Sequence, residues 1–465
     1  MRTGEEIVQD VSRLMLVRTS ELAEFTRLRR WADGQAGTPD VPAGSEEEVK
    51  HLAEVAKRNV ISMVIDTFAQ NLAVVGYRSA DSAQEATGWD LWQRARMDAR
   101  QGEVHRPALT YGLSYVVLRP FTQGGDLQWL PRSPRQLVAF YEHDGVSPWP
   151  VYALETWTQV EGSMVRLKGA FVDDTHVYPV DLGPAQVWEE VRATALTGAR
   201  AITSVDVEGA FAHGAVYDGA PVCPVVRFVN GGDTDTGPLG EVAPLIAPQR
   251  ALNEVSFDRH LVSRFGAFPQ KVISGWSGSA SEVLAASARR VWTFEDSEVK
   301  AQSLPGASME PYNSVIEEIT KHVAQVAQIS PTQIAGQMAN LSAEALWAAE
   351  ASQQRKLDAK REAFGESWEL ALHLAVETTQ GPGAVEHGAE VVWRDTEARA
   401  FGAVVDGIVK LAQAGVPIDL LMPSVPGMTQ QQITAIRQRV GTDSQVRQAL
   451  DLLTRPPTLL EAEET

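Results

Sequence analysis

Apolar residues in the middle of the chain recur at three- and four-residue steps, the spacing that lines one face of an α-helix. One such stretch runs from Gly240 to Phe265 and a second from Glu310 to Ile329. Pro244 and Pro248 fall early in the first stretch, where the N–H groups of a first helical turn have no partner within the helix. The pattern therefore predicts two amphipathic helices, each roughly 30–37 Å long, with residues 266–308 inserted between them.

Helical periodicity also marks both ends of the chain. It predicts helices from about Glu5 to Trp31, from Val49 to Leu72 and from Gly88 to Tyr111. Beyond Ser342 it predicts one long helix, and a last helical region extends from about Thr396 to Leu452. The run SEEEVK predicts a helix N-terminus, with Ser45 as the cap and the acidic residues in the first turn.

Between these helical parts, short runs alternate in hydrophobicity and are separated by Gly and Asp, which is typical of antiparallel strands. The runs are GLSYVVLRP, VYALETWTQV, GSMVRLKGAFV and HVYPV. They predict a β-rich meander that lasts to about Phe228. The fold class expected from the whole pattern is α+β, mainly helical.

Composition narrows the class of protein. A chain of 465 residues exceeds the size at which single cores tend to divide, so we expect about two to four domains. The single cysteine, Cys223, cannot form an internal disulfide, and no apolar run approaches membrane-spanning length. The N-terminus, with Glu5, Glu6 and Asp10, does not resemble a signal peptide. We therefore expect a soluble protein made in a reducing compartment, without a membrane partner.

The charge balance is acidic. The net charge is −19 and the isoelectric point about 5.0, which argues against a nucleic-acid binder that works by neutralising phosphates. Contact with DNA is not excluded by this balance, and acidic surfaces also keep proteins soluble.

Signatures of catalysis and metal binding are missing. The chain has no phosphate-binding loop of the form G-x-x-x-x-G-K-[ST], and its nine histidines lack metal-ligand spacing. His105 fits a buried or surface position better than a catalytic base, and Asp233 with Asp235 fits a turn better than a cation site. We expect no catalytic residue, no cofactor and no metal.

Several longer strings, in a fixed order from Asn59 to about Glu377, carry a family resemblance. They are NVISMVIDTFAQNLAVVGYR, MDARQGEVHRPALTYGLSYVVL, PVVRFVNGGDTDTGPLGEVAPLIAPQRALNEVSFDRHL, RFGAFPQKVISG, ISPTQIAGQMANLSAEALWAAE and FGESWE. Through these strings the chain resembles the portal proteins of siphophage-type tailed bacteriophages. Residues 1–58 and 378–465 match in general helical character alone.

The resemblance implies a structural protein of the virion and not an enzyme. Such proteins form a homo-oligomeric ring, usually of about twelve subunits, at one capsid vertex, after synthesis in the host cytoplasm. Double-stranded DNA passes through the ring without sequence specificity during packaging and ejection. The other partners implied are the terminase large subunit, which hydrolyses ATP, the head–tail adaptor, and the major capsid and scaffolding proteins.

The family's parts can be carried onto this sequence. They are a wing at residues 1–239, stem helices at 240–265 and 309–329, a clip at 266–308, a channel loop at 330–341, a long kinked helix at 342–378, and a crown with the C-terminal tail at 379–465.

The channel loop is uncharged, which suits a surface that DNA must pass without being held. Its candidate residues are Gln333, Gly336, Gln337, Met338 and Asn340, where the amides offer transient hydrogen bonds and the glycine gives flexibility. An ordinary linker between two helices is the alternative.

The clip segment combines aromatic residues with arginines, a mixture enriched in protein interfaces. Its candidate docking residues are Trp276, Arg289, Arg290 and Trp292. A small local core with solvated arginines is the alternative interpretation.

On the polar side of the second stem helix, Glu317 and Lys321 are candidates for the channel face. Lys321 could meet a phosphate, or it could pair with Glu317 one turn earlier.

Two other classes of function remain open. A different ring-forming component of a virion, such as a connector or capsid protein, would share the acidic charge but would not need the series helix, insertion, helix, loop. A hydrolase with a site in the β-rich region could use Asp173, Asp174 and His176, although adjacent Asp-Asp-Thr is more often a turn.

Overall fold

The protein is described by a computed structural model. It describes residues 2–142, 147–184, 204–233, 235–266, 270–274, 300–304, 306–330, 333–334, 343–383, 387–395, 401–416 and 430–436, with the single positions 385, 421, 425 and 428. For 270–274, 300–304, 343–349 and 401–405 it describes the backbone alone.

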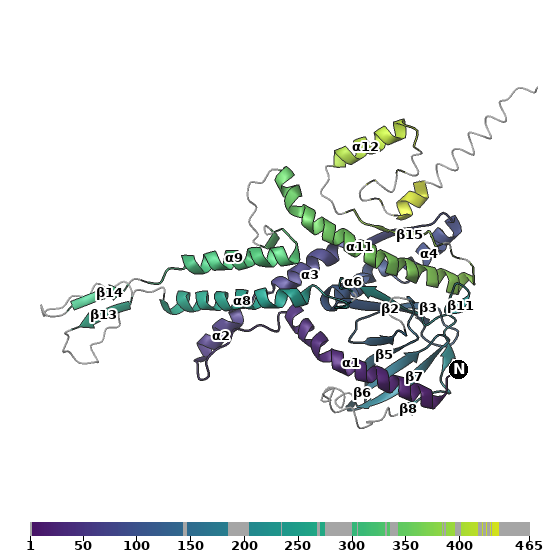
Figure 1. The fold of residues 1–465 in the computed structure, drawn as a ribbon, viewed down its shortest axis with the longest axis horizontal. Coiled ribbons are helices and arrows are strands. Elements are labelled where there is room, and N and C mark those ends of the chain that lie inside the picture. Colours follow the sequence, from purple (N-terminus) through teal and green to yellow (C-terminus); the bar gives the residue numbers. More distant parts are fainter. Residues whose placement is uncertain are drawn as a thin grey trace, which may run out of the picture.

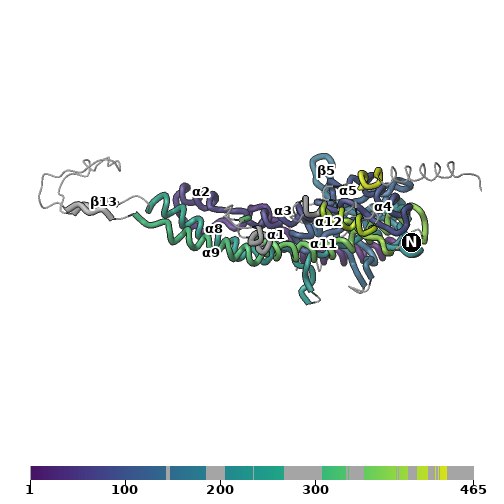
Figure 2. The backbone as a smooth tube through the Cα atoms, turned by 90° about the horizontal axis from the view of Figure 1, so that it is seen from above, coloured from purple at the N-terminus to yellow at the C-terminus, as the bar shows by residue number. Residues whose placement is uncertain are grey.

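The molecule is elongated, with a body of helices and sheets from which a two-helix stem projects (Figures 1 and 2). The stem consists of α8 (Val242–Leu261) and α9 (Glu310–Ala327), which pack side by side. Beyond the far end of the stem, β13 (Gln270–Ser274) and β14 (Lys300–Leu304) form a two-stranded antiparallel sheet. The inserted segment therefore begins and ends as two paired strands at the tip of the stem.

The two stem helices end in different ways. Where α8 stops, the chain continues as a π-helical turn, η2 (Val262–Gly266). The second helix, α9, ends at Ala327 because Gln328 adopts a left-handed conformation with φ of 58°. Both helices confirm the helical stretches expected from periodicity, within a few residues at each end.

A six-stranded sheet forms one side of the body, and its central strands are the expected meander. Its order is β4 (Leu137–Phe140), β5 (Tyr152–Glu161), β6 (Met164–Val172), β7 (His176–Pro184) and β8 (Ser204–Val205), with β9 (Phe211–Ala212) paired to β7. In register, Leu154 lies opposite Phe171 and Phe171 opposite Tyr178. These side chains form a core against α1 (Gly4–Ala32), whose Ile7 and Val11 are fully buried there.

Three smaller sheets complete the body. One has the order β12 (Val225–Val229), β2 (Leu113–Pro120) and β3 (Leu127–Arg132), and the others pair β1 (Val74–Arg78) with β15 (Glu390–Trp393) and β10 (Val216–Tyr217) with β11 (Ala220–Pro221). About half of the described residues lie in helices and a smaller share in strands, so the fold is mixed α+β, with helices as the larger part.

Two expected helices are broken in the structure. Residues 49–72 form α2 (Glu47–Ala56) and α3 (Val60–Asn71), because the side chain of Asn59 accepts a hydrogen bond from the Ser62 N–H and starts a new helix. Ser45 is not the cap of α2. Its hydroxyl donates to the carbonyl of Pro42, and Glu46 occupies the cap position without a side-chain hydrogen bond.

The segment from residue 88 to 111 is likewise divided. It contains α4 (Ser82–Arg94), α5 (Met97–Arg100) and α6 (Gly102–Tyr111). Arg96 has a left-handed backbone with φ of 56°, which an α-helix cannot continue through. Because this conformation is uncommon outside glycine, the break could not be predicted from the residue types.

The main core is an aromatic cluster beneath α11 (Ala343–Gln380), the longest helix, of 38 residues. Trp368 of α11 lies 4.6 Å from Phe228 and 4.9 Å from Trp92, measured between ring centroids. Its indole N–H donates to Nε2 of His105 over 2.9 Å. Three other elements, α4, α6 and β12, thus meet on one face of α11.

Of the helical region expected between residues 396 and 452, the structure describes α12 (Phe401–Gln413) and a helical segment at 430–436. Cys223 is buried beside β2 and β12, and burial raises the pKa of its thiol well above the usual value. Within the described parts, no helix combines the length and apolar character needed to cross a membrane.

Candidate functional site at the stem and its junction with the body

The stem helices hold together through apolar contacts that are concentrated near the body. The buried residues of α9 are Ile316, Val323, Ala324 and Ala327, so three of the four lie in its last five positions. On α8, Phe257 packs with Ala53 and Ala56 of α2, which covers part of one flank. Nearer the tip, Nη1 of Arg259 donates to Oδ1 of Asn313 on α9 over 3.4 Å.

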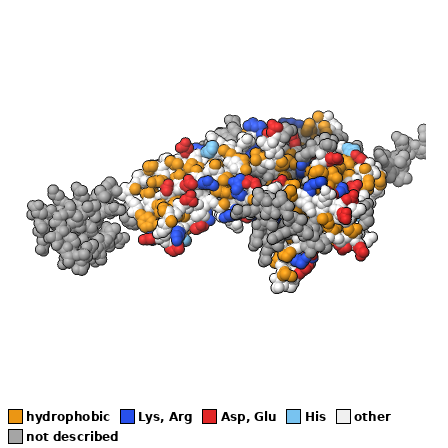
Figure 3. All heavy atoms as spheres, turned by 60° about the horizontal axis from the view of Figure 1, so that its bottom comes forward, with side chains coloured by type: hydrophobic (Ala, Val, Ile, Leu, Met, Phe, Trp, Pro, Cys, Tyr) orange, Lys and Arg blue, Asp and Glu red, His pale blue; other side chains and the backbone are white. Residues whose placement is uncertain are grey.

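The outer side of α9 is polar and accessible. Glu317 and Lys321 are both exposed, and no ion pair joins these two residues within 4.0 Å. Figure 3 shows that acidic, basic and apolar side chains alternate over the stem on the face that it displays, without a field of one sign. Both candidate side chains are therefore available to groups outside the subunit.

At the base of the stem, one buried carboxylate joins both stem helices to α11. Glu241, the residue before α8, receives hydrogen bonds from Lys356 Nζ over 2.6 Å and from Lys360 Nζ over 2.5 Å. Lys356 also donates to the carbonyl oxygen of Ala327, the last residue of α9, over 3.1 Å. Lys360 donates to Oδ1 of Asn230, which follows β12, over 2.5 Å. We call Glu241, Lys356, Lys360 and Asn230 the Glu241 junction.

The electrostatics of the Glu241 junction favour the ionised carboxylate. Burial by itself raises the pKa of Glu241, but the two lysines outweigh burial and hold that pKa below its usual range. Burial lowers the pKa of Lys360, and Glu241 opposes this change. Two lysines that share one carboxylate hold the start of α8 and the end of α9 against α11.

No motif in the sequence indicated the Glu241 junction. Glu241 and Lys360 are 119 positions apart, and each is an ordinary charged residue within a helical pattern. The spacing of Lys356 and Lys360, one turn apart on α11, places both on one face, but it does not indicate their partner.

The expected channel-loop and clip residues are described in part. Gln333 is exposed, and its backbone N–H donates to the carbonyl of Ser330 over 3.0 Å. Gly336, Gln337, Met338 and Asn340 lie outside the described residues, as do Trp276, Arg289, Arg290 and Trp292 of the clip. For the clip segment, the structure describes the paired strands at its base, where Gln270 lies opposite Leu304.

The residues of the alternative hydrolase site form a turn. Oδ1 of Asp173 accepts hydrogen bonds from the backbone N–H groups of Thr175, over 2.9 Å, and His176, over 2.6 Å, between β6 and β7. Asp233 similarly accepts from the N–H groups of Asp235 and Thr236. Both arrangements satisfy local backbone donors, which is the usual role of Asp in turns.

His105 is part of the core. Its Nδ1 lies 3.2 Å from the carbonyl oxygen of Leu72, and its Nε2 accepts from Trp368. Complete burial lowers its pKa to about 3, so the ring is neutral and held between two partners. No group of three or more His, Cys, Asp or Glu in the described parts is arranged to hold a metal.

Known proteins of similar sequence are phage portal proteins. The chain is 26% identical over 363 residues to the portal protein of Mycobacterium phage D29, covering 75% of this chain and 71% of that protein. It is 25% identical over 367 residues to the portal protein of Mycobacterium phage L5, with the same two coverages.

Solved structures with a related arrangement come from a gene transfer agent (GTA) particle. A chain from the neck of the empty particle, computed with C6 symmetry, has 12% identity and a TM-score of 0.48, covering 85% of this chain and 98% of that chain. A chain from the native virion has 13% identity and a TM-score of 0.44, covering 86% and 100%.

The family model described as "Phage portal protein, SPP1 Gp6-like" matches residues 18–444, which is most of the chain. This match and the two mycobacteriophage relatives confirm the resemblance seen in the sequence. They also confirm a structural role, without enzymatic activity, at the portal vertex of a phage capsid. The chain belongs to the SPP1 Gp6-like family of phage portal proteins.

Proposed function

We propose that copies of this portal protein assemble into a closed ring, of about twelve subunits as is usual in the family, through which DNA enters and leaves the capsid. The observation that carries this proposal is the stem, in which α8 and α9 project from the body as an antiparallel pair with two paired strands at the tip. Stems placed side by side around an axis would form a tube with one outward end.

The net charge supports passage of DNA without capture. Twelve copies at −19 each amount to 12 × −19, or about −228 formal charges. An acidic channel wall neutralises few phosphates of the duplex, so few counterions are released. The DNA therefore binds the wall weakly and moves along it with little work.

The finer division of the chain follows the stem. The wing would be residues 1–239, the stem helices 240–265 and 309–329, the clip 266–308, the channel loop 330–341, the long kinked helix 342–378 and the crown 379–465. In support, the inserted segment starts and ends at the stem tip, and the segment after α9 lies between two helices that the Glu241 junction holds together.

Partners follow from these positions. The clip, at the outward end, would meet the terminase large subunit during packaging and the head–tail adaptor afterwards. The body would contact the major capsid and scaffolding proteins. Glu317 and Lys321, exposed on α9, would lie along the DNA channel.

The test is the mass and the shape of the purified protein. Mass measurement in solution, over a range of salt and protein concentrations, should give a closed oligomer, and negative-stain images should show an axial hole and a protruding stem. A monomer under all conditions would contradict the proposal. Rings without a stem would favour another connector or capsid component.

A further inference from the structure

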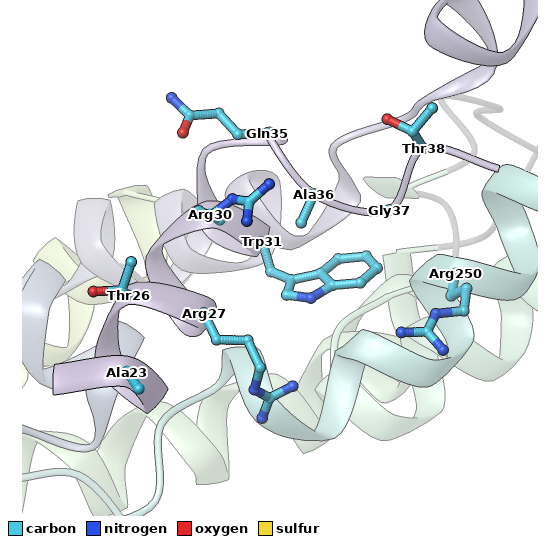
Figure 4. A pocket seen from close by; sticks show the side chains of 10 residues that line it. All are labelled: Ala23, Thr26, Arg27, Arg30, Trp31, Gln35, Ala36, Gly37, Thr38 and Arg250. Carbon is cyan, nitrogen blue, oxygen red and sulfur yellow. The ribbon is translucent and has the colours of Figure 1, made fainter. Parts of the chain in front are cut away.

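A pocket on one flank of the stem is lined by three arginines. It lies where the C-terminal end of α1 and the loop after it meet α8, and has a volume of about 440 Å³. Figure 4 shows Arg27, Arg30 and Arg250 arranged around the indole ring of Trp31. We call it the arginine pocket. It is a concave, positively charged place on a protein whose net charge is −19.

The walls of the arginine pocket are fixed by packing. Trp31 is 6% exposed and belongs to the main core. Gly37 has φ of 79°, and a Cβ at this position would lie 2.5 Å from the indole ring, so a glycine is required for the loop to cross it. Nδ2 of Asn253 on α8 donates to the Gly37 carbonyl over 2.9 Å and ties the loop down. The pocket therefore has its shape before anything binds.

Two of the three guanidinium groups have no counter-ion in the described parts of the chain. Arg27 pairs with Glu24, with Nη2 and Oε1 2.6 Å apart. The Arg250 guanidinium lies 5.9 Å from the centre of the Trp31 ring, a cation–π distance, and neither it nor the Arg30 guanidinium forms an ion pair with a described residue. A planar carboxylate suits this arrangement, because a guanidinium binds both of its oxygens at once.

The symmetry of a ring indicates where such a carboxylate would come from, and this step depends on the proposed ring. In a closed ring every interface joins two different faces, and neighbours are related by rotation without a shift along the axis. The arginine pocket lies on the flank of α8 covered by α1 and α2, whereas α9 lies on the other flank (Figure 1). A neighbouring subunit would therefore present its α9 to the pocket.

The heights of the residues along the stem select one glutamate. The hydrogen bond from Arg259 to Asn313 sets the level of α9 against α8. Toward the body, Arg250 lies nine positions from Arg259 on α8, and Glu318 lies five positions from Asn313 on α9. The two residues therefore differ in height along the stem by four positions, or about 6 Å. An extended arginine side chain spans this distance. Glu318 is exposed, and it lies about 100° around α9 from Glu317, which stays available for the channel.

We propose that the arginine pocket binds the Glu318 carboxylate of the neighbouring copy of this chain, with Arg250 as the main cation and Arg30 as the second. The contact gives the stems of an acidic protein an attractive ion pair at every interface. It also fixes the register in which one stem packs against the next.

The test uses charge reversal in the full-length protein. Arg250→Glu places two carboxylates at each interface, and Glu318→Arg places an arginine among the arginines. Each variant alone should lower the fraction of protein in rings at least about tenfold at a fixed low concentration. Arg94→Glu, at an exposed position on α4, is the control and should assemble normally. Circular dichroism checks that each variant is folded.

Mixing the two single variants gives the decisive result. In a ring that alternates Arg250→Glu with Glu318→Arg subunits, every interface is either the native pair or the reversed pair, so rings should return. If the double variant in one chain assembles but the mixture does not, the contact lies within a subunit and the proposal is wrong.

The remaining outcomes are also distinct. Normal rings from Arg250→Glu would overturn the proposal and leave the ring itself intact. If those rings hold DNA less tightly than wild-type rings at low salt, the arginine pocket is a phosphate site instead. If the wild-type protein forms no ring, the proposed function fails and this inference fails with it.

Discussion

The body and the stem differ in how completely they bury their own side chains. In the body, Trp92, Trp129 and Trp368 are almost inaccessible and contact each other from three separate segments. In the stem, the first half of α9 buries Ile316 alone, and Val315 beside it is 41% exposed. The body therefore has a complete core within one subunit, whereas the outer stem has a surface suited to further contacts.

The largest effect should come from the body. Trp368→Ala removes the indole at the centre of the aromatic cluster and leaves His105 without its donor, so we expect the free energy of unfolding to fall by about 3–5 kcal/mol. Urea unfolding followed by circular dichroism measures this. Trp157→Ala, at a 42% exposed position on β5, is the matched control and should stay within about 0.5 kcal/mol. Equal losses of unfolding free energy in the two variants would contradict the contrast between a buried and an exposed tryptophan.

The next effect lies at the boundary between the two regions. Glu241→Gln leaves Lys356 and Lys360 without their shared counter-ion, and we expect a loss of about 2–4 kcal/mol in the same measurement. Glu47→Gln, at an 86% exposed carboxylate on α2, should change little.

Acid should reduce the difference between Glu241→Gln and the wild type. The pKa of Glu241 is lower in the folded chain than in the unfolded chain, where it is about 4.3. The stabilisation from ionised Glu241 is therefore complete above that pH and is lost as pH falls through the folded pKa. A gap between variant and wild type that widens in acid would contradict the assigned charge state.

A smaller and gradual effect should come from the buried histidines of the body. Burial lowers the pKa of His105 to about 3 and, with His387 nearby, that of His373 to about 4. Since both values lie below the unfolded value of about 6.5, the unfolded chain binds more protons between these limits, and stability decreases as pH falls. At pH values where a histidine is protonated in the unfolded chain but neutral in the folded chain, we expect the free energy of unfolding to fall by roughly 1 kcal/mol per pH unit for that histidine.

Substitution of one histidine tests the acid response. His105→Gln keeps an amide that can serve both Leu72 and Trp368, so its unfolding free energy should vary less steeply with pH than that of the wild type. His51→Gln, at an exposed position on α2, should retain the wild-type slope. Identical slopes in all three proteins would show that other groups control the acid response.

The smallest effect on stability is expected after the stem. Gln333 is exposed, and Gln333→Lys with Gln337→Lys should change the unfolding free energy by less than about 0.5 kcal/mol. In a ring of about twelve subunits the pair adds roughly 24 positive charges, so DNA packaging should slow and depend more on salt. Gln93→Lys, on α4 of the body, is the control: it also adds a positive charge, but away from the expected channel, and should package DNA normally. Normal packaging at low salt would contradict the channel-loop assignment.

Periodicity predicted the elements of this fold better than their boundaries. The stripes on α8 and α9 identified both stem helices, because an amphipathic helix shows its buried face directly in the sequence. The breaks at Arg96 and Asn59 were missed, since they depend on single backbone conformations and local hydrogen bonds.

The candidate site was less predictable than the fold. Neither the Glu241 junction nor the aromatic cluster around Trp368 could be derived from spacing, because both join positions more than a hundred residues apart. The ordered strings of residues indicated the family. The contacts that hold the stem in place were found only in the three-dimensional structure. The arginine pocket likewise combines residues of α1 and the loop after it with Arg250 of α8, which lies more than two hundred positions further along the chain.

The burial of Cys223 makes this chain convenient for spectroscopy. Its thiol is the one sulfhydryl of the sequence, and because the group is enclosed and its pKa is raised, it should react slowly with maleimide reagents. A Val315→Cys variant would then carry a single accessible thiol on the outer stem. Dyes or spin labels attached there would report distances between neighbouring stems, in rings caught before, during and after the passage of DNA.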